Sequence, residues 1–351
     1  MPFRRWFAAL LSCLASGQET PFAQEPVNPW QPAWELTLRG DQLSDPGEPS
    51  ERFQRAGLQW RLRWAWEGEG LRFVAGTRSA MGSDGNRFNG PRWDQQPSNG
   101  SQLDLAQGEA FWASERAFGD LRLGFQENGL LSSQAIWDQD LRLLGLGARA
   151  GFRSPQGVLQ EASLRGVAGR VREVLGGKAD LAAGQLVLKI DAGPWSWTAH
   201  AGRWQLSWEP GEERLRRLPG HDPASRQVLA LDEAGAAVKW HGRLPVEIRW
   251  SGAKNRESGE TSEEAQLLAG GRERLYWPQL ALTWQRLSST GTLYPVNGDE
   301  WWYYRRARGP RLELAMPLPG NWIATFSILR QRFDGESQQV VRRMLVLKKR
   351  F

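Results

Sequence analysis

Arginine is the most abundant chemically active side chain in this sequence of 351 residues, since it supplies 39 of the 45 basic residues. Eight arginines lie in segments where polar and apolar residues alternate: Arg61, Arg63, Arg72, Arg78, Arg122, Arg149, Arg249 and Arg311. Because a guanidinium group is always charged and presents five N–H donors, arginines gathered on one face attract anions. A GC-rich codon bias, with side chains that extend to a membrane interface, explains the same arginine content and stays open as an alternative.

Other chemistry has little support. The three histidines, His200, His221 and His241, lie 21 and 20 residues apart, which is no metal-ligand spacing. Cys13 is the only cysteine, and Ser207 has no G-x-S-x-G context. We therefore expect no metal, no cofactor and no enzyme activity. The basic residues are spread along the chain, so we expect no nucleic-acid partner either.

The first residues have the pattern of a secretion signal. Arg4 and Arg5 precede an apolar stretch from Trp6 to Ala15, and Ala15-Ser16-Gly17 offers a small-x-small cleavage site. Residues 1–17 are the expected signal peptide, with a cut after Ala23 as an alternative. Its removal takes away the only cysteine, which suits an oxidising compartment without disulfides. A periplasmic segment, 18–32, then leads into the body of the protein.

From residue 33 onward the apolar residues recur with a period of two, which is the period of β-strands. Trp60, Leu62, Trp64 and Trp66 share one face of such a strand, while arginines share the other. The same alternation recurs over 34–39, 71–78, 121–126, 144–152 and several later segments. Only 158–175 would also suit a helix.

The connections between these strands differ in length. Short links such as 67–70 and 192–194 alternate with longer polar stretches near 83–102, 131–141, 210–226, 257–262 and 290–304. Short turns at one end and longer loops at the other are typical of bacterial transmembrane β-barrels. The length of the chain predicts about 16 strands, or 14 if one hairpin near 262–278 is absent.

The strands favour a membrane barrel over a soluble sheet. Many of the 20 Trp lie near strand ends, where a ring can face hydrocarbon while its N–H reaches water. Strand-built membrane proteins must close into a barrel, because every backbone polar group needs a partner in lipid. We therefore predict an all-β fold over 33–351: a closed antiparallel transmembrane barrel with short periplasmic turns and longer extracellular loops.

Two segments carry a resemblance to a known family. The final strand, 342–351, ends in Phe351, and such a terminus resembles the signature that outer-membrane barrels present to the barrel-assembly machinery. Residues 119–152, with Ile136-Trp137-Asp138-Gln139-Asp140 between two Gly-rich strands, look like putative porins of Gram-negative bacteria. The resemblance implies an outer-membrane location and a water-filled channel for small hydrophilic solutes.

The expected function combines these observations. By alternation, the eight arginines are expected to point into the lumen. The resemblance to porins, in which the third long loop commonly folds into the pore, implies that the 131–141 loop does so and carries Asp138 and Asp140 with it. Acids on this loop facing the arginines would create a transverse field at a constriction, which favours polar over apolar solutes, and rings of arginine attract anions. For the two acids, a solvated extracellular turn stays open as an alternative. Two alternatives remain: a plugged structural or adhesive barrel that binds partners through its loops, and an exported soluble β-protein. Outer-membrane lipid is an expected partner, and both a monomer and a homotrimer remain open.

Overall fold

A computed structural model describes residues 31–44, 53–82, 100–133, 136–137, 141–154, 157–174, 177–209, 227–272, 274–288, 290–293, 307–333 and 339–350. These residues form sixteen strands. In the first half the strands are β1 (Gln31–Ser44), β2 (Phe53–Gly68), β3 (Leu71–Gly82), β4 (Gly100–Ala113), β5 (Ala117–Gln126), β6 (Leu143–Phe152), β7 (Leu159–Val174) and β8 (Gly177–Ala192). In the second half they are β9 (Trp195–Glu209), β10 (Gln227–Trp240), β11 (Val246–Asn255), β12 (Thr261–Gly270), β13 (Gln279–Leu287), β14 (Ala307–Leu318), β15 (Trp322–Phe333) and β16 (Gln339–Arg350).

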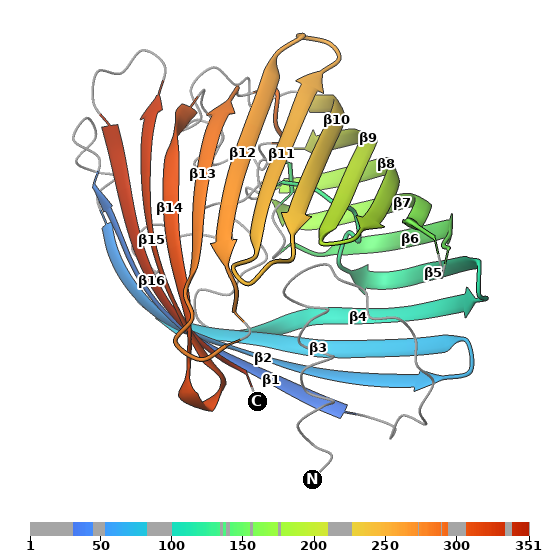
Figure 1. The fold of residues 1–351 in the computed structure, drawn as a ribbon, viewed down its shortest axis with the longest axis horizontal. Helices are drawn as coiled ribbons and strands as arrows, with labels where there is room; N and C mark the ends of the chain where they lie inside the picture. The colour runs from blue at the N-terminus through green and yellow to red at the C-terminus, as the bar shows by residue number, and fades with distance from the viewer. Residues whose placement is uncertain are drawn as a thin grey trace.

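The sixteen strands close into one antiparallel barrel. Each strand pairs with its neighbours in the chain, and β1 pairs with β16 through a register in which Glu35 lies opposite Arg350. Figure 1 shows this order as a continuous change of colour around the wall. The predicted all-β closed barrel is therefore confirmed at sixteen strands, and the alternative of fourteen is wrong.

The two ends of the barrel carry different connections. At one end the strands are joined by short links, such as 69–70, 114–116, 193–194 and the 3-10 turn Pro319–Asn321. At the other end most connections are longer, among them 83–99, 127–142 and 288–306, and we call this end the long-loop end. One connection there differs: β7 ends at Val174 and β8 begins at Gly177, so the segment that also suited a helix is one arm of a tight hairpin.

The outer face of the wall is apolar. Large side chains such as Leu123 and Leu164 are about two-thirds exposed, at 65% and 67%, and they alternate with buried or half-buried neighbours. Near the short-link end, aromatic rings meet across strands: Trp66 lies 5.5 Å from Phe73, and Trp195 lies 6.5 Å from Trp240. An apolar band with aromatic side chains at its margin is the surface that a barrel presents to a bilayer. None of the helices in the described ranges has the length and hydropathy needed to span a membrane.

Candidate functional site

Part of the connection between β5 and β6 contacts the inner face of the wall. The backbone N–H of Leu131, in the connection between β5 and β6, donates to Oε1 of Gln185 on β8 at 2.9 Å. Nε2 of Gln185 donates back to the carbonyl oxygen of Leu131 at 2.6 Å. Gln185 is buried between two exposed neighbours on β8, so its side chain points away from the outer face. These two bonds therefore hold Leu131 against the inner side of β8, three strands beyond β5 in the wall.

An apolar cluster extends this contact. Ile136 and Trp137 are each only 2% exposed, and they pack with Leu141 and Leu143 against strands β7–β10. The strand members include Val167, Val171, Ala179, Leu181, Trp204, Leu206, Trp208, Leu229 and Leu231, joined by Ala253 and Leu293. Since Trp204 and Trp208 alternate with exposed residues on β9, they face inward. This side of the barrel is therefore packed like the core of a soluble protein.

A buried carboxylate lies beside this cluster. Nε1 of Trp204 donates to Oε2 of Glu233 at 2.6 Å, and Nε2 of His200 lies 3.7 Å from Oε1 of the same carboxylate. Glu233 is buried, so the bond from the indole replaces a hydrogen bond to water that it lost on folding. The contact links β9 to β10 on the inner side of the wall.

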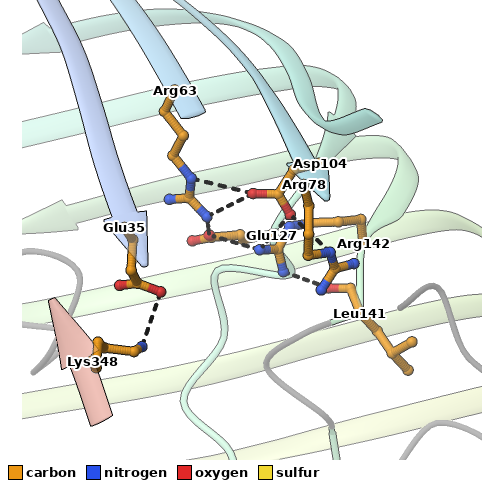
Figure 2. A network of polar contacts seen from close by, with 8 residues as sticks. All are labelled: Glu35, Arg63, Arg78, Asp104, Glu127, Leu141, Arg142 and Lys348. Atoms are coloured by element: carbon orange, nitrogen blue, oxygen red, sulfur yellow. Dashed lines mark hydrogen bonds and ion pairs between the residues drawn. The ribbon is translucent and has the colours of Figure 1, made fainter. Parts of the chain in front are cut away.

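Opposite charges gather on the other side of the interior, around Asp104. The β3–β4 register shifts beside Asp104, so this residue has no partner across the ladder and stands at a β-bulge. Its Oδ2 accepts from Nε and Nη2 of Arg63 at 3.3 and 3.2 Å, and its Oδ1 lies 3.1 Å from Nη2 of Arg142. Arg78 approaches the same carboxylate at 3.9 Å. Figure 2 shows the three arginines converging on Asp104.

Glu127 links this cluster to the segment between β5 and β6. It is contacted by Nη2 of Arg63 at 3.1 Å and by Nη2 of Arg142 at 3.5 Å (Figure 2). Glu127 begins the connection between β5 and β6, and Arg142 ends it. Asp104, Arg78 and Arg142 are at most 1% exposed, so the contacts between Asp104 and these two arginines are shielded from water and strengthened by the low local dielectric, whereas the side chain of Glu127 is 46% exposed. Both ends of the segment are thus held by charges of the wall.

A row of alternating charges continues along the inner face towards the short-link end. Arg72 contacts Glu67 at 2.8 Å and Glu109 at 3.3 Å. Asp120 accepts from Nε of Arg149 at 2.7 Å and lies 3.2 Å from Nε of Arg122. On the next strands, Glu161 contacts Arg165 and Lys189, each at 2.8 Å. Each charge in this row has a partner of opposite sign, because burying an unpaired charge is costly.

The eight arginines selected from the sequence fall into separate groups. Arg63 and Arg78 meet at Asp104, with Arg61 opposite Arg78 in the β2–β3 register. Arg72 lies between Glu67 and Glu109. Arg122 and Arg149 share Asp120. The last two form ion pairs on later strands: Arg249 with Glu247, and Arg311 with Glu313. By strand register all eight lie on the face opposite the exposed apolar residues. Asp138, Asp140 and Phe351 lie outside the described residues.

Sequence reasoning missed several residues of this interior: Asp104, Glu127, Arg142, Glu161, Gln185 and Glu233. Part of the signal was available, because Asp104 lies between Leu103 and Leu105 and therefore alternates like the arginines. The bulge changes that pattern, since Leu105 is buried with Asp104 while Leu103 stays exposed. Within the described ranges no group of His, Cys, Asp and Glu is placed to hold a metal ion.

Solved structures with this architecture are known. The chain aligns with OprB of Pseudomonas putida at a TM-score of 0.65 and 9% identity, over 92% of this chain and 94% of that one. It aligns with OmpF of Salmonella typhi, solved in complex with daunomycin, at 0.56 and 8% identity, over 92% and 97% of the two chains. No family model and no curated protein matches the sequence.

The fold is that of a porin. A loop-deletion variant of OmpT, an outer membrane protein of Vibrio cholerae, gives a TM-score of 0.51 at 9% identity, over 92% of this chain and all of that one. At these identities the likeness concerns the path of the backbone and not the side chains. The porin fold is therefore common to the four chains.

Proposed function

We propose that the protein is an outer-membrane porin, a passive channel for small hydrophilic solutes. The observation that carries this proposal is a closed barrel of sixteen strands, apolar outside and charged on the inner face. In a bilayer the apolar face contacts lipid, and the inner charges need water. Residues 1–17 act as the export signal, and β16 with Phe351 is the segment that the assembly machinery recognises.

The passage that we propose runs between two unlike halves of the interior. The apolar cluster of Ile136, Trp137 and β7–β10 fills one half, and the charged rows from β2 to β6 face it. Water and solutes follow the charged half, because an apolar packed cluster excludes them. The segment from Leu131 to Leu141 is then the constriction, and the arginines of β2, β3, β5 and β6 form the wall that a solute meets.

Planar bilayer recordings test this function. Purified protein is expected to produce stepwise ion conductance, with a reversal potential in a salt gradient that favours anions, because arginines outnumber acids on the proposed wall. A structural or adhesive barrel plugged by the inner cluster would insert without conductance steps. A soluble β-protein would be extracted without detergent and would show no heat-dependent shift on SDS gels. Cross-linking in detergent distinguishes a monomer from a homotrimer.

The two acids of the constriction give a sharper test. Replacing Asp138 and Asp140 together with Asn removes two negative charges from the segment that faces the arginines. The reversal potential is expected to shift further towards anions, with the number of inserted channels unchanged. Asp191→Asn is the matched control, because Asp191 lies exposed at the short-link end of β8. An unchanged reversal potential in the double variant would contradict the placement of these acids in the passage.

A further inference from the structure

The connection between β13 and β14 begins on the inner face of the wall. Asn255 on β11 and Ser262 on β12 are each buried between two exposed neighbours, so their side chains point inward. Nδ2 of Asn255 donates to the carbonyl oxygen of Thr290 at 2.8 Å. The backbone N–H of Ser288 donates to Oγ of Ser262 at 2.9 Å. The start of this connection is therefore held against the inner side of the β11–β12 hairpin, whose strands lie side by side in Figure 1.

Three polar side chains form a latch between this connection and the turn of the hairpin: Ser258, Glu260 and Thr290. Oγ1 of Thr290 donates to Oε2 of Glu260 at 2.7 Å, and the backbone N–H of Thr290 donates to the same oxygen at 3.4 Å. Oγ of Ser258 lies 2.8 Å from Oγ1 of Thr290. Since the hydroxyl of Thr290 gives its only hydrogen to Glu260, Ser258 is the donor in this second contact. The latch therefore fixes Thr290 by its side chain and its backbone together.

The residues that follow the latch reach the apolar cluster. Thr292 and Leu293 are both completely buried. Leu293 belongs to the cluster that also contains Ile136 and Trp137 of the connection between β5 and β6. Ala253 of β11 is a member of the same cluster, so the hairpin that carries the latch also lines this core. Two connections from distant parts of the chain therefore share one packed core on the inner side of the wall.

We infer that Leu293 is a positioning residue: held by the latch, it keeps Ile136 and Trp137 in place at the edge of the passage. Side chains in a densely packed cluster constrain one another, so a shift of one member passes to its neighbours. The latch fixes Thr290, and Leu293 follows shortly after it in the chain. The inference rests on the proposed channel function. It gives the β11–β12 hairpin an influence on a passage whose proposed arginine wall lies on other strands.

A reversible cross-link at the latch tests the inference in planar bilayers. The double variant Ser258→Cys with Thr290→Cys places two thiols where oxygens now lie 2.8 Å apart, within reach of a disulfide. Cys13, the only native cysteine, lies in the expected signal peptide. The oxidised channel should match the wild type. Reduction in the bilayer leaves only weak thiol contacts, so open-channel current noise should rise at least about twofold as the connection loosens.

Two further variants separate positioning from general stability. Adding Leu293→Ala to the double variant cuts the link between the latch and the cluster, so this channel should be noisy in both redox states. The matched control is Ser79→Cys with Ser101→Cys, two residues that lie opposite each other on β3 and β4 with their oxygens 2.7 Å apart. Its disulfide joins strands that are already paired, so neither oxidation nor reduction should change the current noise.

Equal noise of the oxidised and reduced double variant would overturn the inference, and so would a redox effect that persists with Leu293→Ala. Both states are compared in the same assembled barrel, so a folding defect cannot explain a difference. A wild type without conductance steps would argue against the channel itself. Hydrogen exchange in detergent then decides the positioning: the amides of Ile136 and Trp137, which donate to the carbonyl oxygen of Ser133, should exchange faster on reduction only while Leu293 is present.

Discussion

Asp104→Asn is expected to destabilise the barrel and to loosen the segment between β5 and β6. The carboxylate is fully buried and contacts Arg63 and Arg142, with Arg78 nearby, so its removal leaves buried positive charges without their common partner. Breaking a buried charge pair in this way costs about 3–5 kcal/mol. The midpoint temperature for loss of the fast-migrating band on unboiled SDS gels should fall, and bilayer conductance should become larger and noisier.

The control for this variant is Asp180→Asn. Asp180 also pairs with an arginine, Arg170, but both side chains are about half exposed, at 45% and 52%. Exposed ion pairs contribute about 1 kcal/mol or less, so the control should keep the wild-type midpoint and conductance. Wild-type behaviour of Asp104→Asn would show that the Asp104 cluster does not hold the segment.

Trp137→Ala is expected to weaken a second attachment of the same segment, its packing in the apolar cluster. Trp137 is 2% exposed and packs among the apolar side chains that face inward from β7–β10. Truncating a buried aromatic residue costs about 3–5 kcal/mol, from lost burial and from the cavity left behind. The open-channel current should rise and fluctuate, because a segment held only by its ends and by the Leu131–Gln185 hydrogen bonds can move within the passage.

Trp250→Ala serves as the matched tryptophan control. Trp250 stands on the outer face of β11 with 46% of its surface exposed, so its loss removes contacts with lipid and leaves the interior intact. Conductance of this control should match that of the wild type. Identical single-channel records for Trp137→Ala and the wild type would mean that the apolar cluster does not set the width of the passage.

The barrel wall was predictable from sequence because its physical determinant is local. The period-two alternation over 60–67 or 144–152 depends only on which side of a strand meets lipid. The same alternation, together with the lengths of the connections, predicted about 16 strands, and the structure has sixteen. Residues 158–175 were ambiguous since Ala, Leu, Arg and Glu favour helices, and pairing with β6 and β8 decides for a strand.

The interior contacts were not predictable, because they join residues far apart in the sequence. Leu131 binds Gln185, which lies 54 residues further along the chain, and nothing near either residue marks the other. From the sequence alone, Trp204 and Trp208 fit equally well as outward-facing residues at the membrane–water interface, whereas in the structure they face inward. The bulge at Asp104 depends on how β3 and β4 fit together, which no alternation pattern reveals.

The seam between β1 and β16 bears on the order in which the molecule is built. All other strand pairings join neighbours in the chain, so this seam alone unites its two ends. The contact between Leu131 and Gln185, and the packing of Trp137 against β7–β10, need only strands from the middle of the sequence. Loops of shorter sequence separation close at a lower cost in chain entropy. A curved sheet that has not yet closed can therefore already bind Leu131 and Trp137, so these contacts can form before β1 pairs with β16.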